Sequence, residues 1–507
     1  MTTGGDTAGR GKIRVLVQTD VPQNAGTQEI FRIAEEAWRA STGFEVDKGY
    51  RPVGIRLKPS APKGYPPVQT SRPDVDKRRR PAGTKLPDVG EGRRPGRAQD
   101  PNAERGDNQG GTEAPRERSV QPPAAGLRTV ILRGRIPEAQ ISALRARANV
   151  RKVSRDIRLD PFAVRRKVGS DCEKTGQPVG DVKLLAKRLG VDKIWAQGYD
   201  GHGVVVGVVD GGITAYGRDV NATELPAIPY SPATGRVADG WPDDWGTTAV
   251  GWGQHGNMMA FDIQTVAPAA TLWDIRIWEP AGVFDVYLSN AIAGYREAID
   301  RHRLSGEPHI LSNSWGLYRR DLDDDGEYAS NPQSLFAVMV EEALDEGILV
   351  LFAAGNCGEP CPFSLCRRDP LDTANIGPGK SILGPNGHPR VMTIGAANLE
   401  DDWCAYTSQG FAVLPPNAAK PDFCAYTRFE GYFPGADPIL RDFDGGTSAA
   451  TAVAAGVIAL LKHKRPDLTQ EEARAVLAET AQDILMPGFD QNSGAGIIRA
   501  NAAFDLL

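Results

Sequence analysis

The chain has 507 residues, of which 40% are hydrophobic, and it contains 57 Gly and 38 Pro. This length suffices for several domains, and the composition excludes a coiled coil, a collagen-like rod and a fully disordered chain. The net charge of −5 hides a split: residues 1–180 carry 35 basic and 21 acidic side chains, a balance of +14, whereas the rest carries 24 and 43, a balance of −19. Opposite signs indicate two blocks with different roles.

Residues 58–126 differ in composition from their surroundings. Residues 58–125 hold 12 of the 38 prolines, few large aliphatic side chains and the run Arg78-Arg79-Arg80. Such a segment buries too little apolar surface to offset chain entropy, so we expect a disordered, flexible linker. Its basic runs could bind nucleic acid, but no aromatic or Gly pattern accompanies them, so a solvated tether is the preferred interpretation.

The pieces on either side of this linker have the patterns of folded elements. Residues 13–18 alternate like a strand, residues 28–40 have apolar positions at helical spacing, and residues 44–57 read as a second strand. After the linker, residues 128–133 predict a strand, 137–148 a helix opened by Pro137, and 150–153 a last short strand. We therefore expect one small α/β sandwich over residues 10–165, with the linker inserted into it.

From about residue 185 to the end, near-continuous apolar strands alternate with helices. The expected strands are 204–209, 272–277, 309–312, 348–353 and 391–394, and the expected helices are 286–303, 332–345, 449–463 and 470–480. This pattern predicts an α/β domain whose mainly parallel sheet is covered by helices on both faces.

Four polar residues occupy positions where a parallel sheet gathers functional groups. Asp210 closes the strand GVVVGVVD, His255 precedes an expected helix, Asn356 closes ILVLFAAGN, and Ser448 lies in a Gly-rich turn that leads into an Ala-rich helix. A serine at a helix start is usually a cap, but the small residues around Ser448 let its hydroxyl point into a cleft. An Asp that orients a His, a His that takes the Ser proton and an amide at the oxyanion form a complete acyl-transfer set.

These segments, taken together, resemble those of the subtilisin-like serine peptidases (subtilases), whose chain order is Asp, His, Ser. GHGVVVGVVDGGI, HGNMMA with TVAPAATLWDIRIW, HILSNSWG, VLFAAGN and GGTSAATAVAAG resemble the family's successive blocks, in order. The resemblance implies a three-layer subtilisin-like domain over residues 185–507, with catalytic Asp210, His255 and Ser448 and with Asn356 as oxyanion donor. It also implies a substrate cleft along a wall that contains Ser314, Trp315, Gly316, Ala354 and Gly355.

Subtilase propeptides are small βαββαβ sandwiches that assist folding and block the cleft, so the resemblance implies this role for the N-terminal sandwich. Processing would then fall between about residues 160 and 185. We expect a serine endopeptidase that acts on proteins or peptides, needs no cofactor and has its own N-terminal module as a partner. The alternatives are a catalytically weak or inactive relative that serves as a peptide-binding or regulatory module and, for the sandwich, an unrelated partner-binding domain. Trp315 either shapes the substrate pocket or lies in the core.

Three positions depart from the family pattern: Ala452 stands for a proline, Met258 for a second histidine, and Tyr426 for another proline. None is a catalytic group, but together they indicate a divergent branch. Asp321, Asp323 and Asp325 imitate half of a calcium loop, although Pro332 stands where the closing Glu is expected. An acidic solvated loop is the preferred interpretation, with a structural calcium site as the alternative.

The amino end shows no apolar run of the kind found in secretory signal peptides, and residues 449–461 are too few to cross a bilayer. We therefore expect a cytoplasmic protein without a membrane partner. Cys357, Cys361 and Cys366 lie within ten residues and Cys404 and Cys424 follow, but C-x3-C-x4-C is not a common zinc pattern. A local disulfide or free buried thiols are preferred, and a disulfide would argue against the cytoplasm.

Overall fold

The computed structural model describes residues 11–57, 123–162, 178–215, 237–247, 252, 254–278, 286–414, 418–432 and 443–507. The expected linker over residues 58–126 therefore lies outside the described residues, apart from its last four positions. The domain boundaries at 10–165 and 185–507 stay predictions.

A seven-stranded sheet organises the larger part of the chain, with the strand order β15-β14-β13-β11-β7-β9-β8. All neighbouring strands in it are parallel. Its strands are β7 (Val205–Asp210), β8 (Val237–Trp241), β9 (Thr271–Arg276), β11 (Ile310–Asn313), β13 (Leu349–Ala353), β14 (Met392–Ala397) and β15 (Phe423–Tyr426). The parallel α/β sheet expected from the apolar runs is confirmed.

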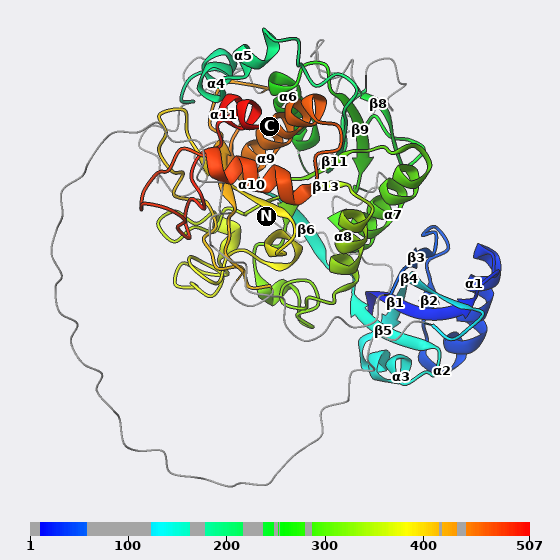
Figure 1. Cartoon of the computed structure of the whole chain (residues 1–507). Coiled ribbons are helices and arrows are strands. Elements are labelled where there is room, and N and C mark those ends of the chain that lie inside the picture. The colour runs from blue at the N-terminus through cyan, green and yellow to red at the C-terminus, as the bar shows by residue number, and fades with distance from the viewer. Residues whose placement is uncertain are drawn as a thin grey trace, which may run out of the picture. The chain divides into compact units, whose positions relative to one another are not determined.

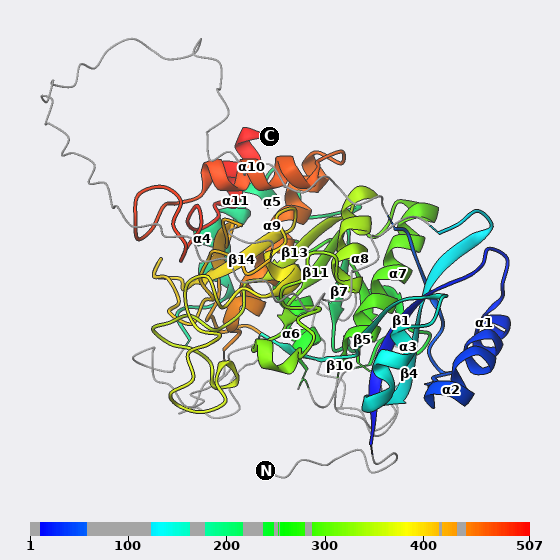
Figure 2. The same cartoon turned by 90° about the horizontal axis from the view of Figure 1, so that it is seen from below.

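Helices cover both faces of this sheet. Successive strand residues point to opposite faces, so neighbouring residues of one strand belong to different cores. Val206 and Val208 of β7 belong to a core with helices α6 (His255–Val266) and α9 (Gly446–Lys464). Val209 belongs to the second core, with α7 (Leu288–Ser305) and α8 (Leu335–Asp345). Figures 1 and 2 show the resulting layers, with α9 and α8 on opposite sides of the strands.

Shorter helices complete this part of the chain: α4 (Val182–Leu189), α5 (Val191–Trp195), α10 (Gln470–Thr480) and α11 (Ala500–Leu506). The expected helix 470–480 coincides with α10, whose start is fixed by a capping box between Thr469 and Glu472. The helix expected from residue 332 begins only at Leu335, because the Ser334 hydroxyl accepts the Ala337 N–H at 3.0 Å and caps it. Among the described residues, none of the helices has the length and apolarity needed to span a membrane.

Residues 11–57 and 123–157, which we call the N-terminal module, form an antiparallel sheet with the path β2-β4-β1-β5, and β3 also pairs with β4. The strands are β1 (Lys12–Pro22), β2 (Glu45–Val46), β3 (Val53–Ile55), β4 (Leu127–Pro137) and β5 (Val150–Arg155). The helices are α1 (Thr27–Ala34), α2 (Ala40–Thr42) and α3 (Ile141–Arg145), and a π-helical turn over Glu35–Arg39 joins the first two.

The single strand expected over residues 44–57 is wrong. It is divided into β2 and β3 by a turn in which the Asp47 carboxylate accepts the Gly49 N–H at 2.9 Å. The helix expected from Pro137 is also shorter, because Pro137 ends β4 and α3 begins at Ile141 after a 3-10 turn. The remaining strands of the module contain their predicted ranges, whereas the single helix expected over residues 28–40 is an α-helix only to Ala34 and continues as the π-helical turn.

Candidate active site

Asp210 and His255 are brought together by the end of β7 and the start of α6. The His255 Nδ1 atom lies 2.9 Å from each carboxylate oxygen of Asp210, and both residues are 1% exposed. Two glycines permit this approach: a Cβ on Gly256 would lie 2.2 Å from the carbonyl oxygen of Gly212, which itself has φ +108°. The other ring nitrogen of His255, Nε2, is buried and has no hydrogen-bond partner among the described residues.

Ser448 and Asn356 meet at the start of α9. The Asn356 side-chain oxygen accepts hydrogen bonds from the N–H of Thr447 at 3.1 Å and from its hydroxyl at 3.0 Å. These bonds fix the amide so that its Nδ2 faces away from Thr447. The Ser448 hydroxyl donates to the carbonyl oxygen of Ser314 at 2.9 Å.

The carbonyl oxygen of Phe162 lies within hydrogen-bond distance of both Asn356 and Ser448. The oxygen of Phe162 accepts a hydrogen bond from Asn356 Nδ2 at 2.7 Å and from the Ser448 N–H at 3.3 Å. Two donors that converge on one carbonyl oxygen are the arrangement that stabilises a tetrahedral oxyanion in acyl transfer.

Phe162 reaches this position because the segment before it forms a strand in the cleft. Strand β6 (Arg158–Pro161) pairs antiparallel with β12 (Trp315–Gly316) on one side and with β10 (Val286–Tyr287) on the other. The Phe162 N–H continues the pairing by donating to the carbonyl oxygen of Ser314 at 3.0 Å. Backbone pairing of this kind is how extended peptides add to a sheet edge. Sequence reasoning missed β6, because a short RLDPF stretch carries no strand pattern of its own.

The predicted cleft residues divide into two groups. The backbones of Ser314 and Gly316 border β6 and the residue after it, Phe162, and a Cβ on Gly316 would lie 2.7 Å from the Phe162 ring. Gly355 lies behind the same ring, since its Cβ would lie 3.6 Å from it. Ala354 is buried, and its N–H donates to the carbonyl oxygen of Ile394, so it continues the pairing of β13 with β14.

Trp315 contributes its backbone to the cleft, but its side chain does not shape a pocket. The ring is 0% exposed, donates from Nε1 to the Val209 carbonyl oxygen at 2.8 Å and packs against Phe336 and Phe352. The interpretation of Trp315 as a core residue therefore holds, and its interpretation as a pocket residue is wrong.

The Phe162 ring lies in a pocket of aromatic, apolar and sulfur groups. Tyr318 packs edge-on against it, with ring centroids 4.9 Å apart, and the Tyr318 hydroxyl donates to the Pro161 carbonyl oxygen at 3.0 Å. The same buried cluster contains Ala353, Cys357, Cys366 and Ile376, with Phe363 packed against it. Tyr318 carried no signal in the sequence, because only its contact with a residue 156 positions away reveals its role.

The cysteines near the site adopt two states. Cys357 and Cys366 form a disulfide, Cys361 is disulfide-bonded as well, and Cys404 and Cys424 are buried thiols. Among the alternatives that the sequence left open, the local disulfide applies to Cys357 and Cys366 and the buried thiol to Cys404 and Cys424.

The N-terminal module contacts the start of α7 through a buried carboxylate. Asp156 accepts the Ser289 N–H and the Ser289 hydroxyl, each at 2.9 Å, and lies 3.2 Å from the Arg14 guanidinium. Burial nevertheless raises the pKa of Asp156, against the effect of Arg14 and of the hydrogen bonds from Ser289. Apolar side chains surround this contact, because Tyr50 and Ile131 belong to the same core as α7 and α8.

Ion pairs also join the N-terminal module to the larger part of the chain. Basic side chains of the module face acidic ones of the larger part in four pairs: Arg56–Glu346, Arg145–Asp325, Lys152–Glu327 and Arg155–Asp324. Their distances lie between 2.6 and 3.4 Å. The acidic loop that resembled a calcium site therefore supplies carboxylates to the basic module.

The calcium hypothesis fails the geometric test in the described part of the chain. Asp323 directs its carboxylate to the N–H groups of Glu327, Tyr328 and Ala329, at 2.8 to 3.1 Å. Asp321 pairs with Arg319 at 3.2 Å, and Asp325 pairs with the module. Within the described ranges, acidic, His or Cys side chains do not gather in threes in a way that could hold a metal.

A buried carboxylate lies on the strand next to Asp210. Asp274 of β9 is 0% exposed and accepts the Gly246 N–H at 2.7 Å. Burial raises its pKa to about 7, with a smaller upward contribution from Asp210 and opposing ones from the hydrogen bond and from Arg276. This group therefore titrates near neutral pH, close to the candidate site.

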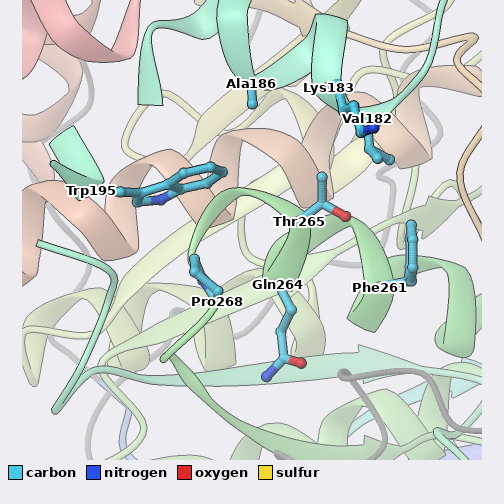
Figure 3. A pocket seen from close by; sticks show the side chains of 8 residues that line it. All are labelled: Val182, Lys183, Ala186, Trp195, Phe261, Gln264, Thr265 and Pro268. Carbon is cyan, nitrogen blue, oxygen red and sulfur yellow. The ribbon is translucent and has the colours of Figure 1, made fainter. Parts of the chain in front are cut away.

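A separate pocket of about 490 Å³ lies between α4, α5 and α6 (Figure 3). Trp195, Phe261 and Pro268 form its apolar walls, and Lys183 and Thr265 add polar groups. Asp210, His255 and Ser448 are not among its lining residues, so the candidate active site is elsewhere.

Comparison with known proteins identifies the family to which this chain belongs. A model of the subtilase family (Peptidase S8) matches residues 201–496, more than half of the chain. The protein is therefore a member of the subtilase family. Its relatives include subtilisin DY of Bacillus licheniformis, 25% identical over 318 residues, or 62% of this chain and 94% of that protein.

A second sequence relative and one solved structure are also similar to this chain. Subtilisin E of Bacillus subtilis is 25% identical over 310 residues, which cover 61% of this chain and 67% of that protein. Among solved structures, fervidolysin from Fervidobacterium pennivorans, a keratinolytic enzyme related to subtilisin, aligns with a TM-score of 0.48 and 19% identity. That alignment covers 74% of this chain and 56% of fervidolysin.

Proposed function

We propose that this protein is a serine endopeptidase in which Ser448 is the nucleophile, His255 the general base, Asp210 its orienting partner and Asn356 an oxyanion donor. The observation that carries the proposal is the carbonyl oxygen of Phe162, held by both Asn356 Nδ2 and the Ser448 N–H. These donors bind the oxygen of a peptide group whose carbon is then presented to the Ser448 hydroxyl.

In the proposed reaction, the Ser448 hydroxyl turns from Ser314 toward His255 Nε2, which is buried and free of other partners among the described residues. The Ser448 oxygen bonds to the scissile carbon while His255 accepts its proton, and Asp210 stabilises the imidazolium through Nδ1. Collapse of the tetrahedral intermediate breaks the C–N bond, and His255 protonates the leaving amine. Water then releases the acyl group by the reverse proton path.

We also propose that the N-terminal module inhibits this site. The peptide bond that connects the module to the peptidase part would be the first bond that the site cleaves. Strand β6 pairs with the cleft edge as an extended substrate would, and Phe162 is the last residue before the bond to Ala163. The proposed cleavage point lies inside the interval of residues 160–185 expected from the sequence. After cleavage the module would remain as a bound product and block the cleft.

The charge split of the sequence supports this role. The four ion pairs between module and peptidase part join basic groups of the +14 block to acidic groups of the −19 block. Apart from Lys152–Glu327, whose carboxylate is buried, these pairs are partly exposed and contribute about 0–1 kcal/mol each. The partly exposed pairs therefore guide docking and make it sensitive to salt more than they fix it. The buried contacts of Asp156, Tyr50 and Ile131 supply the rest.

A serine-directed fluorophosphonate probe tests the proposed nucleophile. We expect labelling of the wild-type chain at Ser448, and none in Ser448→Ala, together with hydrolysis of a denatured protein by the wild type alone. A folded wild type that is neither labelled nor active would contradict the proposal. It would favour the alternative of an inactive relative that binds peptides in its cleft.

The cytoplasmic location expected from the sequence stays a prediction. The Cys357–Cys366 disulfide weighs against it, because structural disulfides are typical of oxidising compartments. Protein or peptide substrates are the proposed partners, in addition to the module.

A further inference from the structure

Gln254, the residue before His255, has a left-handed backbone. Its φ is +67°, and it precedes α6 as the cap residue without a capping bond from its side chain. Residues other than glycine rarely adopt this conformation, and they keep it only where surrounding contacts hold them. The Gln254 side chain is held by Tyr432, whose hydroxyl donates to its Oε1 atom at 2.6 Å. A contact from a distant segment therefore fixes the turn that presents His255.

Tyr432 also contacts the segment that leads to Ser448. It is 5% exposed, and its N–H donates to a carboxylate oxygen of Asp444 at 2.6 Å. Asp444 lies four residues before Ser448 in the chain. The Tyr432 ring lies against Phe261 of α6, with ring centroids 6.0 Å apart. One buried residue thus bonds both the turn before His255 and the turn before Ser448.

A second contact joins the same two segments. Asp262 of α6 is 0% exposed, and its carboxyl group hydrogen-bonds that of Asp444. Two carboxyl groups can do so only when one of them is protonated, and none of the other described residues donates a hydrogen bond to Asp262. Burial, with the Asp444 carboxylate beside it, raises the pKa of Asp262 well above its usual range, so Asp262 carries the proton. Asp444 is therefore an acceptor for both Asp262 and Tyr432.

The helices that carry the two reacting side chains also pack on each other directly. A Cβ on Gly456 of α9 would lie 2.7 Å from the carbonyl oxygen of Ile263 on α6, so the helices approach closely at this point. At the helix starts, His255 Nε2 has no hydrogen-bond partner among the described residues. The distance from this nitrogen to the Ser448 hydroxyl depends on what holds the two starts, and Tyr432 contacts the residues that precede both.

We propose that Tyr432 is a positioning residue, which holds His255 Nε2 where the Ser448 hydroxyl can reach it. It acts through its bonds to Gln254 and Asp444 rather than by contact with a reacting atom. The inference rests on the proposed peptidase function and adds a residue to it. Proton transfer from hydroxyl to imidazole needs heavy atoms within about 3 Å, so a small shift at either helix start costs rate rather than substrate binding.

The test is Tyr432→Phe, which removes the hydroxyl and keeps the ring against Phe261. The substrate is a chromogenic peptide that copies residues 159–162, Leu-Asp-Pro-Phe, given to the full chain after self-cleavage. Active sites are counted by end-point labelling with the fluorophosphonate probe, so misfolded molecules do not enter kcat. We expect kcat per labelled site to fall about ten-fold, with KM unchanged. A module that stays bound competes with the peptide and leaves kcat unaffected.

The variant Gln254→Met separates a positioning role from a loss of stability. It keeps the length of the side chain and removes the oxygen that accepts the Tyr432 hydroxyl. We expect kcat to fall about ten-fold here too, and to fall no further in Gln254→Met/Tyr432→Phe, because all three chains lack the same bond. The matched control, Tyr426→Phe, removes another buried tyrosine hydroxyl, which donates to Asp401 at 2.5 Å, and should keep the wild-type kcat.

The outcomes separate this inference from the proposed function. A folded, labelled Tyr432→Phe chain with the wild-type kcat overturns the inference alone, whatever its melting temperature. So do losses that multiply in the double variant, or an equal loss in Tyr426→Phe. If Tyr432→Phe does not fold, Gln254→Met decides by the same kcat criterion. A wild type that is not labelled and does not hydrolyse the peptide overturns the proposed function, and the inference with it.

Discussion

The buried Asp274 makes the stability of this protein depend on pH in a calculable way. Its pKa is raised from 3.8 to about 7, mainly by burial, so the folded chain holds a proton that the unfolded chain has lost over this interval. The favourable contribution is fully present below about pH 4 and is lost as pH rises through 7. Between pH 5 and pH 8, linkage with these values gives a loss of about 2.5 kcal/mol in the free energy of unfolding.

The substitution Asp274→Asn removes this titration while keeping an oxygen that can accept the Gly246 N–H. Any cost of burying the new amide is the same at both pH values, so it cancels from the difference. Urea unfolding of the Ser448→Ala chain, which cannot digest itself under the proposed mechanism, gives the free energies. Between pH 5 and pH 8, the free energy of unfolding should fall by about 2.5 kcal/mol less in Asp274→Asn/Ser448→Ala than in the Ser448→Ala parent.

The control is Asp467→Asn, whose side chain is 88% exposed. It should change the free energy of unfolding by less than about 0.5 kcal/mol at either pH. If Asp274→Asn and its parent lose the same stability between pH 5 and pH 8, the raised pKa of Asp274 is refuted.

Three further predictions follow from single contacts. Asn356→Ala should leave the circular dichroism spectrum unchanged and lower kcat by about 10²–10³, the loss known for one oxyanion donor in subtilisin; a smaller loss would remove Asn356 from the oxyanion role. Raising salt from 0.05 to 0.5 M should weaken inhibition by the cleaved module several-fold, and Asp324→Asn/Asp325→Asn should make the inhibition less sensitive to salt. Equal salt sensitivity in the wild type and this variant would exclude a role of these two ion pairs in docking. Asp323→Ala should cost about 2 kcal/mol in unfolding by leaving backbone N–H groups unpaired, against little for Asp321→Ala, and equal losses would contradict it.

The sequence predicted the parts of the fold that depend on local pattern. The apolar run that ends at Asp210 and the Ala-rich helix after Ser448 are long and continuous, so burial on both sides follows from composition alone. The approach of Asp210 to His255 was also predictable, because strand ends meet at one edge of a parallel sheet.

What the sequence did not predict depends on contacts between distant segments. Strand β6 forms through its pairing with β10 and β12, about 130 and 155 residues further along, and Pro161 and the charged Arg158 obscure its pattern. Asp274 stands in the apolar strand β9, and nothing in the sequence around it indicates that its carboxylate is buried. The acidic loop around Asp323 was ambiguous because carboxylates that bind calcium and carboxylates that pair with arginines have the same composition.

The site is proposed to cleave its own chain after Phe162, and mass spectrometry of the purified full chain tests this cleavage most directly. We predict that the wild type yields a fragment that ends at Phe162 and a second that begins at Ala163, whereas Ser448→Ala stays intact. An active wild type that remains uncut at this bond would contradict the account. So would a Ser448→Ala chain cut at the same bond, because the cleavage would then come from another enzyme.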